Sequence, residues 1–306
     1  MGNTILTEVA IIGGGPAGLT AALYLGRAHV DTLVIDKDMC GGQIISSPLL
    51  ENVPGYYGSG AELAINLLNE VEKYPSVSFE MFNKVVKVQA CFDKDMEESY
   101  ELELEDGQKV CCKYLICATG SNPIHLKGIE GPNVHYCVTC DGALYQDKVA
   151  AVIGGGNSAL QYALELETYA DKVYIVTNED SLRGEEVMRN RVEYSDKILV
   201  ITNFTASEFS ANHLYSTDGE VIQVDGVFVA VGYKTETEYF NIHKCRGRFE
   251  TDQHYYIFNG DFYFSNSFAI GDCRDKLFNQ VVIAMGEGCQ VALQIIGTLE
   301  KQKQFT

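Results

Sequence analysis

The 306-residue chain is poor in proline and poor in basic residues. It has six prolines and no low-complexity tract, so the sequence predicts no long disordered linker. Lysine and arginine number 23 against 42 aspartates and glutamates, which gives a net charge of −19. Nucleic acid and anionic membranes repel an acidic surface, so neither is expected as the main partner.

The N-terminal segment lacks the features of a targeting signal. It has no basic n-region and no cleavage site of a signal peptide, and Leu6 stands where a myristoylation signal needs Ser or Thr. The longest apolar stretch, Val9 to Gly26, begins with several glycines and a proline, unlike a membrane-spanning helix. We therefore expect a soluble, cytoplasmic protein that does not bind membranes.

The ten cysteines lack the regular spacing of a secreted, disulfide-stapled domain, and most are expected to be small buried apolar residues. The pair in Cys137-Val-Thr-Cys140 is different. A zinc site would need a second pair of ligands at suitable spacing, whereas Cys111 and Cys112 are adjacent and His135 is too close in sequence to be independent. The sequence therefore predicts no metal site.

A redox-active dithiol explains Cys137 and Cys140 better than two buried structural thiols, because Thr139 and Asp141 make the loop polar. Two intervening residues allow ring closure in a helix-like loop, so each thiol can act as the resolving partner of the other. The thiolate is the attacking species, so a proton must be managed nearby. Asp141 is the candidate acid and base.

A first glycine-rich loop lies within a complete nucleotide-binding pattern. The pattern consists of a buried strand over Glu8–Ile12, the turn Gly13-x-Gly15-x-x-Gly18, a helix over Ala17–Arg27, a strand over Thr32–Ile35, and Asp36. The glycines allow the backbone to approach a pyrophosphate at a helix N-terminus, and the acidic residue can accept hydrogen bonds from ribose hydroxyls. A glycine-rich turn without a ligand is the less favoured alternative.

A second pattern of the same kind follows. It consists of a strand over Val149–Ile153, the turn Gly154-x-Gly156-x-x-Ala159, a helix over Leu160–Tyr169 and a strand over Val173–Val176. Antiparallel strands are expected over Lys84–Gln89 and Ser99–Glu105, with a final strand over Phe268–Asp272 and a helix over Val281–Leu299. The duplication predicts an α/β chain of two Rossmann-like, three-layer ββα domains, one inserted in the other.

Several longer motifs now support a resemblance. GGGPAGLTAA, GGQI with ENVPG, CATGS, CVTCDG, GGGNSA, VDGVFVAVG and FAIGDC occur in this order. In this combination the chain resembles the low-molecular-weight thioredoxin reductases over nearly its whole length. The resemblance implies an FAD domain in two parts, 1–116 and 235–306, around a central domain, 117–234. It also implies a homodimer.

The resemblance further implies a role for individual residues. The implied FAD-binding residues are Gly13, Gly15, Pro16 and Ala17 at the pyrophosphate, Asp36 and Lys37 by the adenosine, Gly42, Gln43 and Asn52 along the flavin, Thr119 and Gly120 over the cofactor, and Asp272 near the ribityl or pyrophosphate region. The family's Arg-Gln-Ala after this aspartate is matched by Asn279, Gln280 and Val281, so the arginine is missing.

The resemblance also gives the two cysteines different roles. Cys140 would face the flavin and take its electrons, and Cys137 would attack the disulfide of a thioredoxin-like protein. One dithiol does not easily face a flavin and a protein at the same time, so the central domain is expected to swing.

The stretch IVTNEDSLRG, Ile175 to Gly184, lacks the cations of an NADPH site. Family members that use NADPH carry His-Arg-Arg where this chain has Thr177, Asn178 and Glu179, and Arg183 alone remains. A 2′-phosphate carries a charge of about −2, so this exchange turns attraction into repulsion. NADH would want an acid at the strand end, where Thr177 stands. We predict a vestigial nucleotide site.

Electrons must then come from another donor. A subgroup, the ferredoxin-dependent flavin thioredoxin reductases, lacks the phosphate-binding arginines and keeps the CxxC motif, and this chain is similar to it. We therefore expect reduced ferredoxin as the donor and thioredoxin as the substrate. Two alternatives remain open: an NAD(P)H-dependent reductase with an atypical nucleotide site, and a flavin-bound redox sensor without turnover.

Overall fold

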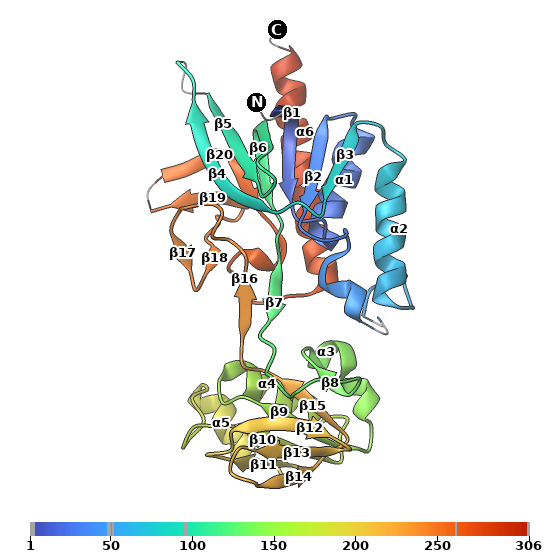
Figure 1. The fold of residues 1–306 in the computed structure, drawn as a ribbon, viewed down its shortest axis with the longest axis vertical. Coiled ribbons are helices and arrows are strands. Elements are labelled where there is room, and N and C mark those ends of the chain that lie inside the picture. The colour runs from blue at the N-terminus through green and yellow to red at the C-terminus, as the bar shows by residue number, and fades with distance from the viewer. Residues whose placement is uncertain (1–3, 48–49, 51, 95–96, 261, 305–306) are drawn as a thin grey trace. The chain divides into compact units, whose positions relative to one another are not determined.

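The computed structural model describes all residues except 1–3, 48–49, 51, 95–96, 261 and 305–306 (Figure 1). The chain forms two compact units, one made of Met1–Asn122 with Thr235–Thr306 and the other of Pro123–Lys234. The first boundary therefore lies after Asn122 and not after residue 116. The reason is that β6 (Lys109–Cys117) is a central strand of the first unit and carries the turn after it into the same unit.

An eight-stranded sheet forms the centre of the first unit. Its strands are β1 (Thr4–Ile12), β2 (Thr32–Asp36), β3 (Val77–Met81), β4 (Val85–Phe92), β5 (Glu98–Leu104), β6, β19 (Tyr256–Asn259) and β20 (Phe262–Ala269). The main path runs β19-β20-β6-β1-β2-β3, and β5 pairs with both β6 and β4. The pairs β20–β6, β6–β1, β1–β2 and β2–β3 are parallel, so these strands end at one common edge.

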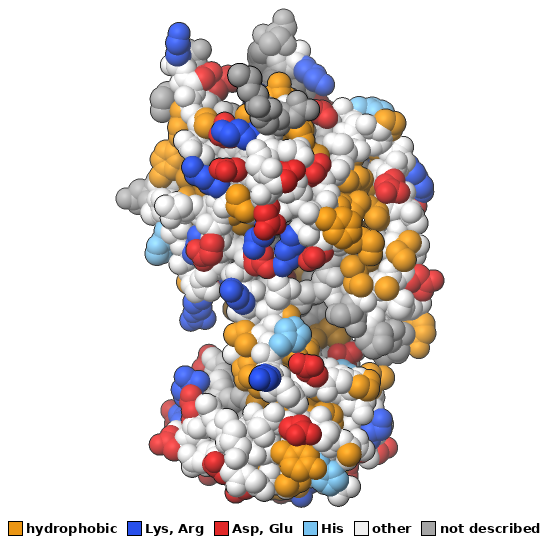
Figure 2. All heavy atoms as spheres, in the orientation of Figure 1, with side chains coloured by type: hydrophobic (Ala, Val, Ile, Leu, Met, Phe, Trp, Pro, Cys, Tyr) orange, Lys and Arg blue, Asp and Glu red, His pale blue; other side chains and the backbone are white. Residues whose placement is uncertain are grey.

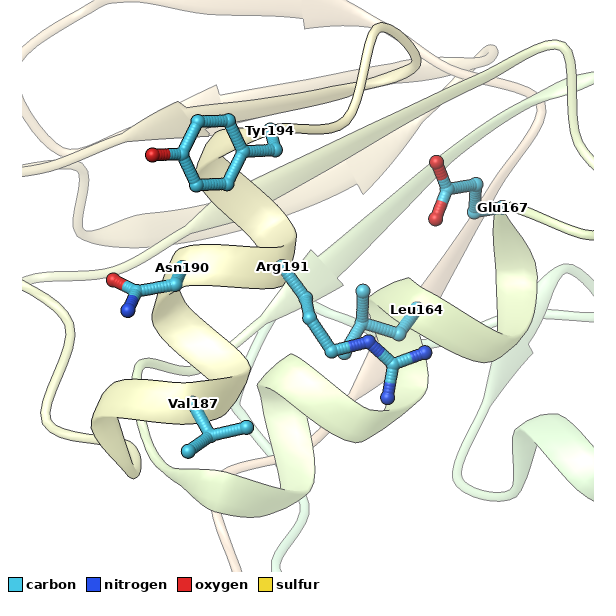
Figure 3. A pocket seen from close by; sticks show the side chains of 6 residues that line it. All are labelled: Leu164, Glu167, Val187, Asn190, Arg191 and Tyr194. Carbon is cyan, nitrogen blue, oxygen red and sulfur yellow. The ribbon is translucent and has the colours of Figure 1, made fainter.

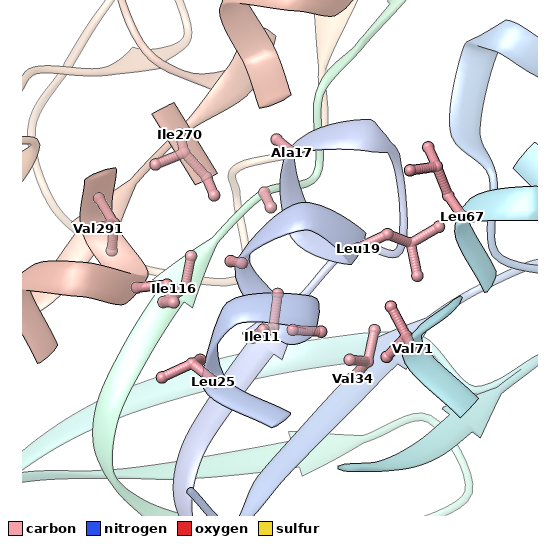
Figure 4. Close-up of a cluster of buried hydrophobic side chains, with 14 of the residues drawn as sticks. Ile11, Ala17, Leu19, Leu25, Val34, Leu67, Val71, Ile116, Ile270 and Val291 are labelled. Carbon is pink, nitrogen blue, oxygen red and sulfur yellow. The ribbon is translucent and has the colours of Figure 1, made fainter. Parts of the chain in front are cut away.

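Alternating side chains send the two faces of this sheet into separate cores. In β1, Val9 and Ile11 join a cluster completed by the helices α1 (Pro16–Arg27), α2 (Gly60–Glu72) and α6 (Val281–Gln304) (Figure 4). Ala10 and Ile12 join a second cluster with residues of β4 and β5. Helices thus cover one face and strands cover the other, which makes three layers.

The second unit repeats this plan on a smaller scale. Its parallel sheet has the order β11-β10-β9-β15-β8. Its elements are β8 (Val134–His135), β9 (Val149–Ile153), β10 (Lys172–Val176), β11 (Ile198–Ile201), β15 (Gly226–Val229), the antiparallel β12 (Ala206–Ser210), β13 (His213–Ser216) and β14 (Val221–Gln223), and the helices α3 (Val138–Asp141), α4 (Asn157–Leu166) and α5 (Glu186–Glu193).

In β9, Ala150 and Val152 pack on the helix side, and Ala151 and Ile153 pack on the β12–β14 side. The predicted α/β architecture, two Rossmann-like domains with one inserted in the other, is confirmed.

Short elements complete the fold. They are the paired strands β7 (Ser121–Pro123) and β16 (Tyr233–Thr235), the paired strands β17 (Lys244–Cys245) and β18 (Arg248–Phe249), and the single 3-10 turns η1 (Gly42–Ser46), η2 (Gly142–Tyr145) and η3 (Gly271–Cys273). On the face drawn in Figure 2, acidic side chains are interspersed with basic ones.

Within the described residues, α6 is long and apolar enough to cross a membrane by length and composition. Val291, Ala292 and Ile295 of this helix are buried in the core that α1 shares. A core helix of a soluble protein meets the same test of composition, so the finding by itself does not assign α6 to a membrane.

The start of α6 is tied to the end of β20 by a buried carboxylate. Glu287 is 3% exposed, accepts the N–H of Gly271 at 2.6 Å, and accepts Nε and Nη2 of Arg274 at 3.1 and 2.8 Å. Lys276, also buried, lies 3.4 Å from Glu287 and 3.3 Å from Asp272. Two cations therefore depend on two carboxylates in a region largely out of water.

We predict that Glu287→Ala lowers the free energy of unfolding by about 3 kcal/mol, because it removes the buried carboxylate that contacts both the Arg274 and the Lys276 side chains, which are 17% and 6% exposed. Urea unfolding of the flavin-loaded protein measures this change. Glu300→Ala, at an exposed carboxylate on the same helix, is the matched control and is expected to change stability by less than about 0.5 kcal/mol. Equal stabilities of the two variants would contradict the interpretation.

Candidate functional site

Four of the parallel strands of the first unit bring predicted cofactor residues to one edge of the sheet. Gly13 follows β1, Asp36 ends β2, the Thr119–Gly120 turn follows β6, and Asp272 lies in η3 after β20. In open α/β sheets, ligands bind in the crevice at the carboxyl ends of the strands. The fold therefore assembles residues that are up to 259 positions apart in sequence, 272 − 13, at the expected place.

The glycine turn of this edge is closely packed. Gly13 has φ +106°, and a Cβ at this residue would overlap the backbone carbonyl oxygen of Ala118. The next residue, Gly14, donates its N–H to Oδ2 of Asp36 at 2.6 Å. Burial raises the pKa of Asp36, and the backbone N–H groups of Asp38 and Gly14, which donate to its carboxylate, oppose this effect. A larger residue at 13 would separate the ends of β1 and β6.

Two further predicted segments lie against this turn. Gly41 donates its N–H to the carbonyl oxygen of Gly14 at 2.7 Å, and the backbone of Gly42 lies against Gly15 and Pro16. Gln43 follows in η1.

Residues from the two ends of the first unit also meet. Nδ2 of Asn52 donates to Oε1 of Gln280 at 3.3 Å, just before Val281 begins α6. Ala17 in α1 lies close to Gly271 in η3.

Lys37 and Asp272 each have an ionic partner within the same unit. Lys37 pairs with Glu236, which also binds Nζ of Lys84 at 3.0 Å. Burial raises the pKa of Asp272, and Lys276 at 3.3 Å opposes that effect. The predicted roles of Lys37 and Asp272 beside a cofactor stay predictions.

Buried polar atoms at the same edge give a test of whether a polar ligand fits. Oγ of Ser121, directly after Gly120, and Oδ1 of Asn279, directly before Gln280, are buried without a hydrogen-bond partner among the described residues. Buried polar atoms are normally satisfied. Both atoms belong to segments predicted to line the flavin, and a cofactor rich in donors and acceptors fits them.

The dithiol motif forms one turn of helix in the second unit. Cys137 and Cys140 are joined by a disulfide with their Cα atoms 5.3 Å apart, and both are partly exposed. Cys137 is the N-cap of α3, and the N–H of Cys140 donates to its Sγ at 3.2 Å. Hydrogen bonding to a sulfur favours its thiolate form, so this donor favours Cys137 as the nucleophile after reduction.

Asp141, the predicted acid and base, ends α3 and has a partner that the sequence did not indicate. Its Oδ2 lies 3.1 Å from Nδ1 of His135, which is buried in β8. The sequence pattern bears on His135 only as a possible metal ligand, which its closeness to Cys137 disfavours. Its position six residues before an acid is no recognised motif, and the contact depends on how the chain turns from β8 into α3.

The second glycine loop differs from the first at the position that would meet a ribose. Ile12 pairs with Ile35 in one sheet and Ile153 pairs with Val176 in the other. Thr177, after Val176, is therefore the structural counterpart of Asp36. Its buried hydroxyl lies against Gly155 and accepts the N–H of Glu179 at 3.3 Å.

The remaining cation of this loop is already bound to an anion. Arg183 forms an ion pair with Glu179 and donates its backbone N–H to the carbonyl oxygen of Gly155 at 2.7 Å. Its side chain is 72% exposed, so the pair contributes little to stability. However, the negative charge of Glu179 partly neutralises the positive charge of Arg183, the arginine of this loop.

A surface groove of about 480 Å³ lies between α4 and α5 (Figure 3). Its lining residues are Leu164, Glu167, Val187, Asn190, Arg191 and Tyr194. None of these six residues was predicted to take part in the site. Across the described residues no group of three His, Cys, Asp or Glu side chains is arranged to hold a metal ion.

Comparison with known proteins agrees with this geometry. Residues 7–288 match the family model of the pyridine nucleotide-disulphide oxidoreductases. The chain is 33% identical over 305 residues to the "34.2 kDa protein in rubredoxin operon" of Clostridium pasteurianum, covering 94% of this chain and 95% of that protein. It is 32% identical over 301 residues to a thioredoxin reductase of Listeria innocua, covering 92% and 90%. A crystal structure of thioredoxin reductase from Streptococcus pyogenes matches with a TM-score of 0.87 and 31% identity, covering 98% of this chain and 100% of that one.

The chain therefore belongs to the pyridine nucleotide-disulphide oxidoreductase family. Within this family it is a thioredoxin reductase-like disulfide oxidoreductase, as its full-length relatives indicate. These relatives are FAD-binding flavoproteins, which agrees with the FAD expected from the first glycine loop.

We predict that Gly13→Ala yields protein with less than about a tenth of the flavin of the wild type, since an alanine there is strained and overlaps Ala118. Flavin absorbance per chain, before and after reconstitution with FAD, measures this. Gly297→Ala in α6 adds a methyl group where nothing lies within 4 Å and should keep full flavin. A Gly13→Ala protein that binds FAD like the wild type would refute the role of this turn.

Proposed function

We propose that this protein is an FAD-dependent disulfide reductase that passes electrons through Cys137 and Cys140 to thioredoxin or a thioredoxin-like protein, and that reduced ferredoxin is its electron donor. The observation that carries the proposal is the combination of an intact CxxC disulfide with a second nucleotide loop whose one arginine is paired with an acid. We further propose that it works as a homodimer.

When bound, FAD would supply the two electrons that reduce a disulfide, and it can itself be reduced in one-electron steps by a protein carrier. The residues that would hold it are those at the carboxyl edge of the first unit, with Gly13 and Gly15 at the pyrophosphate and Asp36 at the ribose. Asn52 and Gln280, in contact with each other, would lie along the flavin.

The chain's own residues divide the disulfide chemistry between them. Cys137, whose sulfur accepts the N–H of Cys140, would attack the protein disulfide as the thiolate. Cys140 would then resolve the mixed disulfide by attacking the sulfur of Cys137. Asp141, next to Cys140 in the chain, would deliver protons to the leaving thiolates of the partner.

Electrostatics argue against NADPH as the donor. The 2′-phosphate of NADPH carries about two negative charges near neutral pH. At the loop after β10 it would meet Asn178 and Glu179 where NADPH-using relatives have two arginines, and Arg183 is paired with Glu179. Two lost charge-assisted hydrogen bonds, each contributing about 1.5–3 kcal/mol, correspond to more than a hundredfold in affinity.

NADH is disfavoured for a separate reason. Its ribose hydroxyls are recognised by a carboxylate at the end of the second strand. Asp36 holds that position in the first unit, whereas Thr177, buried against Gly155, holds it in the second. A protein electron donor needs neither the phosphate site nor the ribose site.

The remaining cysteines fit a reducing compartment. All ten cysteines lie in the described part of the chain, and the eight outside the CxxC motif are unpaired. Proteins of oxidising compartments usually pair their cysteines. We therefore propose that the protein works in the cytoplasm.

We predict that Cys137→Ser and Cys140→Ser each abolish thioredoxin reduction and leave flavin content unchanged, because both sulfurs are needed for turnover. A single-cysteine thioredoxin activated as a mixed disulfide with thionitrobenzoate separates their roles. Cys140→Ser should form a stable covalent complex with it, and Cys137→Ser should not. Cys245→Ser, at a partly exposed cysteine outside the motif, is the control. Wild-type turnover by both motif variants would show that other thiols carry the reaction.

We predict that reduced ferredoxin bleaches the flavin within seconds under anaerobic conditions and that micromolar NADPH or NADH does not. The variant Asn178→Arg with Glu179→Arg should gain reduction by NADPH, since it restores two cations and frees Arg183. Glu220→Arg with Gln223→Arg makes the same change of charge at exposed positions of the same unit and should gain none. Rapid bleaching of the wild type by NADPH would overturn the donor assignment.

A further inference from the structure

Three side chains in contact with one another lie beside the dithiol, and two of them, His135 and Tyr145, are buried. His135 in β8 is 7% exposed, and its two ring nitrogens contact different groups. Nδ1 lies 3.1 Å from Oδ2 of Asp141, and Nε2 lies 2.9 Å from the hydroxyl of Tyr145 in η2. Asp141 is thus connected through an imidazole to a phenol inside the second unit.

Aromatic packing fixes the imidazole in this position. The His135 ring stacks on Phe228 of β15, with centroids 5.0 Å apart and an interplanar angle of 26°. The edge of Tyr145 meets both rings, at 5.3 Å and 5.1 Å. A Cβ on Gly226 would overlap the Tyr145 hydroxyl, so the glycine leaves room for it. His135 therefore has little freedom to leave Asp141.

His135, Asp141 and Tyr145 can together gain or lose one proton, and in both states each of their facing polar atoms keeps a partner. Burial, helped by Asp141 and Asp225, raises the pKa of Tyr145, so its hydroxyl stays protonated. With a neutral imidazole, Tyr145 can donate to Nε2, and a proton on Nδ1 faces the Asp141 carboxylate at 3.1 Å. When the imidazole gains a proton, Nε2–H donates to Tyr145, whose hydroxyl turns towards the carbonyl oxygen of Asn133 at 3.5 Å.

Disulfide exchange needs such a proton store. The dithiol loses two electrons and two protons, and the partner disulfide gains both. Cys137 as thiolate forms a bond to one partner sulfur while the partner S–S bond breaks, and the first leaving thiolate takes a proton. Cys140 then gives its proton to Asp141 and forms a bond to the Cys137 sulfur, the mixed disulfide breaks, and the second leaving thiolate takes a proton from Asp141. An aliphatic thiol has a pKa of about 8–9, so the corresponding thiolate is a poor leaving group unless a proton is supplied to it.

We propose that His135 is a positioning residue for this proton transfer: it holds the Asp141 carboxyl at the dithiol and, backed by Tyr145, resupplies the proton that Asp141 gives to the leaving thiolate. The inference rests on the disulfide-reductase function proposed above. It adds a residue to that function, and it distinguishes a proton relay from an aspartate held in place for structural reasons.

Other titratable groups among the described residues also face this cluster, and Nζ of Lys148 lies 5.6 Å from the centroid of the Tyr145 ring. The Cys137–Cys140 pair flanks it on α3, and Asp225 acts on Tyr145 from the start of β15. The carboxylate of Asp225 accepts the backbone N–H of Val149 at 2.9 Å. On α4, Glu165 accepts from the hydroxyl of Thr139. Of these groups, His135 is the one whose side chain contacts the Asp141 carboxylate.

Two small disulfides with different leaving groups test the relay on the flavin-loaded full chain. The protein is reduced with dithiothreitol, desalted without oxygen and mixed at pH 8 with either 2-hydroxyethyl disulfide or 5,5′-dithiobis(2-nitrobenzoate). The first has an alkyl thiolate leaving group that needs a proton, and the second has an aryl thiolate that does not. His135→Asn keeps a donor towards Asp141 and removes the proton-accepting ring.

We expect His135→Asn to slow the reaction with 2-hydroxyethyl disulfide at least about tenfold, which is less than the ~10²–10⁴-fold contribution of a general acid because Asp141 itself is kept, and to leave the reaction with the aryl disulfide within about twofold. Tyr145→Phe keeps the His135–Asp141 contact and should slow the first reaction by about threefold, again without affecting the second. It tests the same claim if His135→Asn does not fold.

His125 provides the matched control. Its Nδ1 contacts the hydroxyl of Tyr136 at 2.7 Å in the same unit, and its side chain is exposed. His125→Asn should leave both reactions unchanged. Equal slowing of both disulfides in His135→Asn, or no slowing of either, would overturn the relay. Neither reaction uses thioredoxin or ferredoxin, so a failure of the proposed function appears separately, as absent thioredoxin turnover by a protein that still passes this test.

Discussion

The close approach of Gly13 to the carbonyl of Ala118 is the constraint on which the cofactor side of the molecule depends. It keeps the ends of β1 and β6 together, and the next N–H can then reach Asp36 at the end of β2. The loop at Gly41 and Gly42 packs onto the same turn. An edge made of backbone groups, one carboxylate and a helix N-terminus suits a dinucleotide, because the ligand brings the pyrophosphate and ribose hydroxyls that these groups recognise.

The second unit repeats the fold with different side chains at the corresponding edge. Thr177 stands at the position of Asp36, and the cation nearest to it is matched by Glu179. The dithiol lies in the same unit. The N–H of Cys140 donates to the sulfur of Cys137, and His135 contacts Asp141, the residue after Cys140. The second unit thus combines a nucleotide-binding type of fold with the dithiol, and what the fold binds depends on the side chains at its edge.

Much of the fold could be predicted from the sequence because its signals are local. The strands around Ile12 and Ile153 are short apolar runs ending at glycines, and turn residues mark their ends. The cofactor residues at the first glycine turn stay predictions based on a motif whose spacing has a physical reason, and the other cofactor residues stay predictions based on the family resemblance. The His135–Asp141–Tyr145 chain did not follow, because it depends on β8 pairing with β15 and on Phe228 stacking against the imidazole. From the sequence, Arg183 is the cation that remains in the second loop. Its ion pair with Glu179 could not be predicted, because it depends on the conformation of the loop.

The central claim is that flavin and dithiol form one electron path, and counting electrons tests it most directly. Anaerobic titration with dithionite, followed by flavin absorbance and free-thiol content, is the measurement. The account predicts uptake of about four electrons per chain, two by FAD and two by the Cys137–Cys140 disulfide. The flavin and the disulfide should exchange electrons and stay in equilibrium throughout the titration. Uptake of about two electrons per chain, with the disulfide left intact after the flavin has bleached, would contradict it.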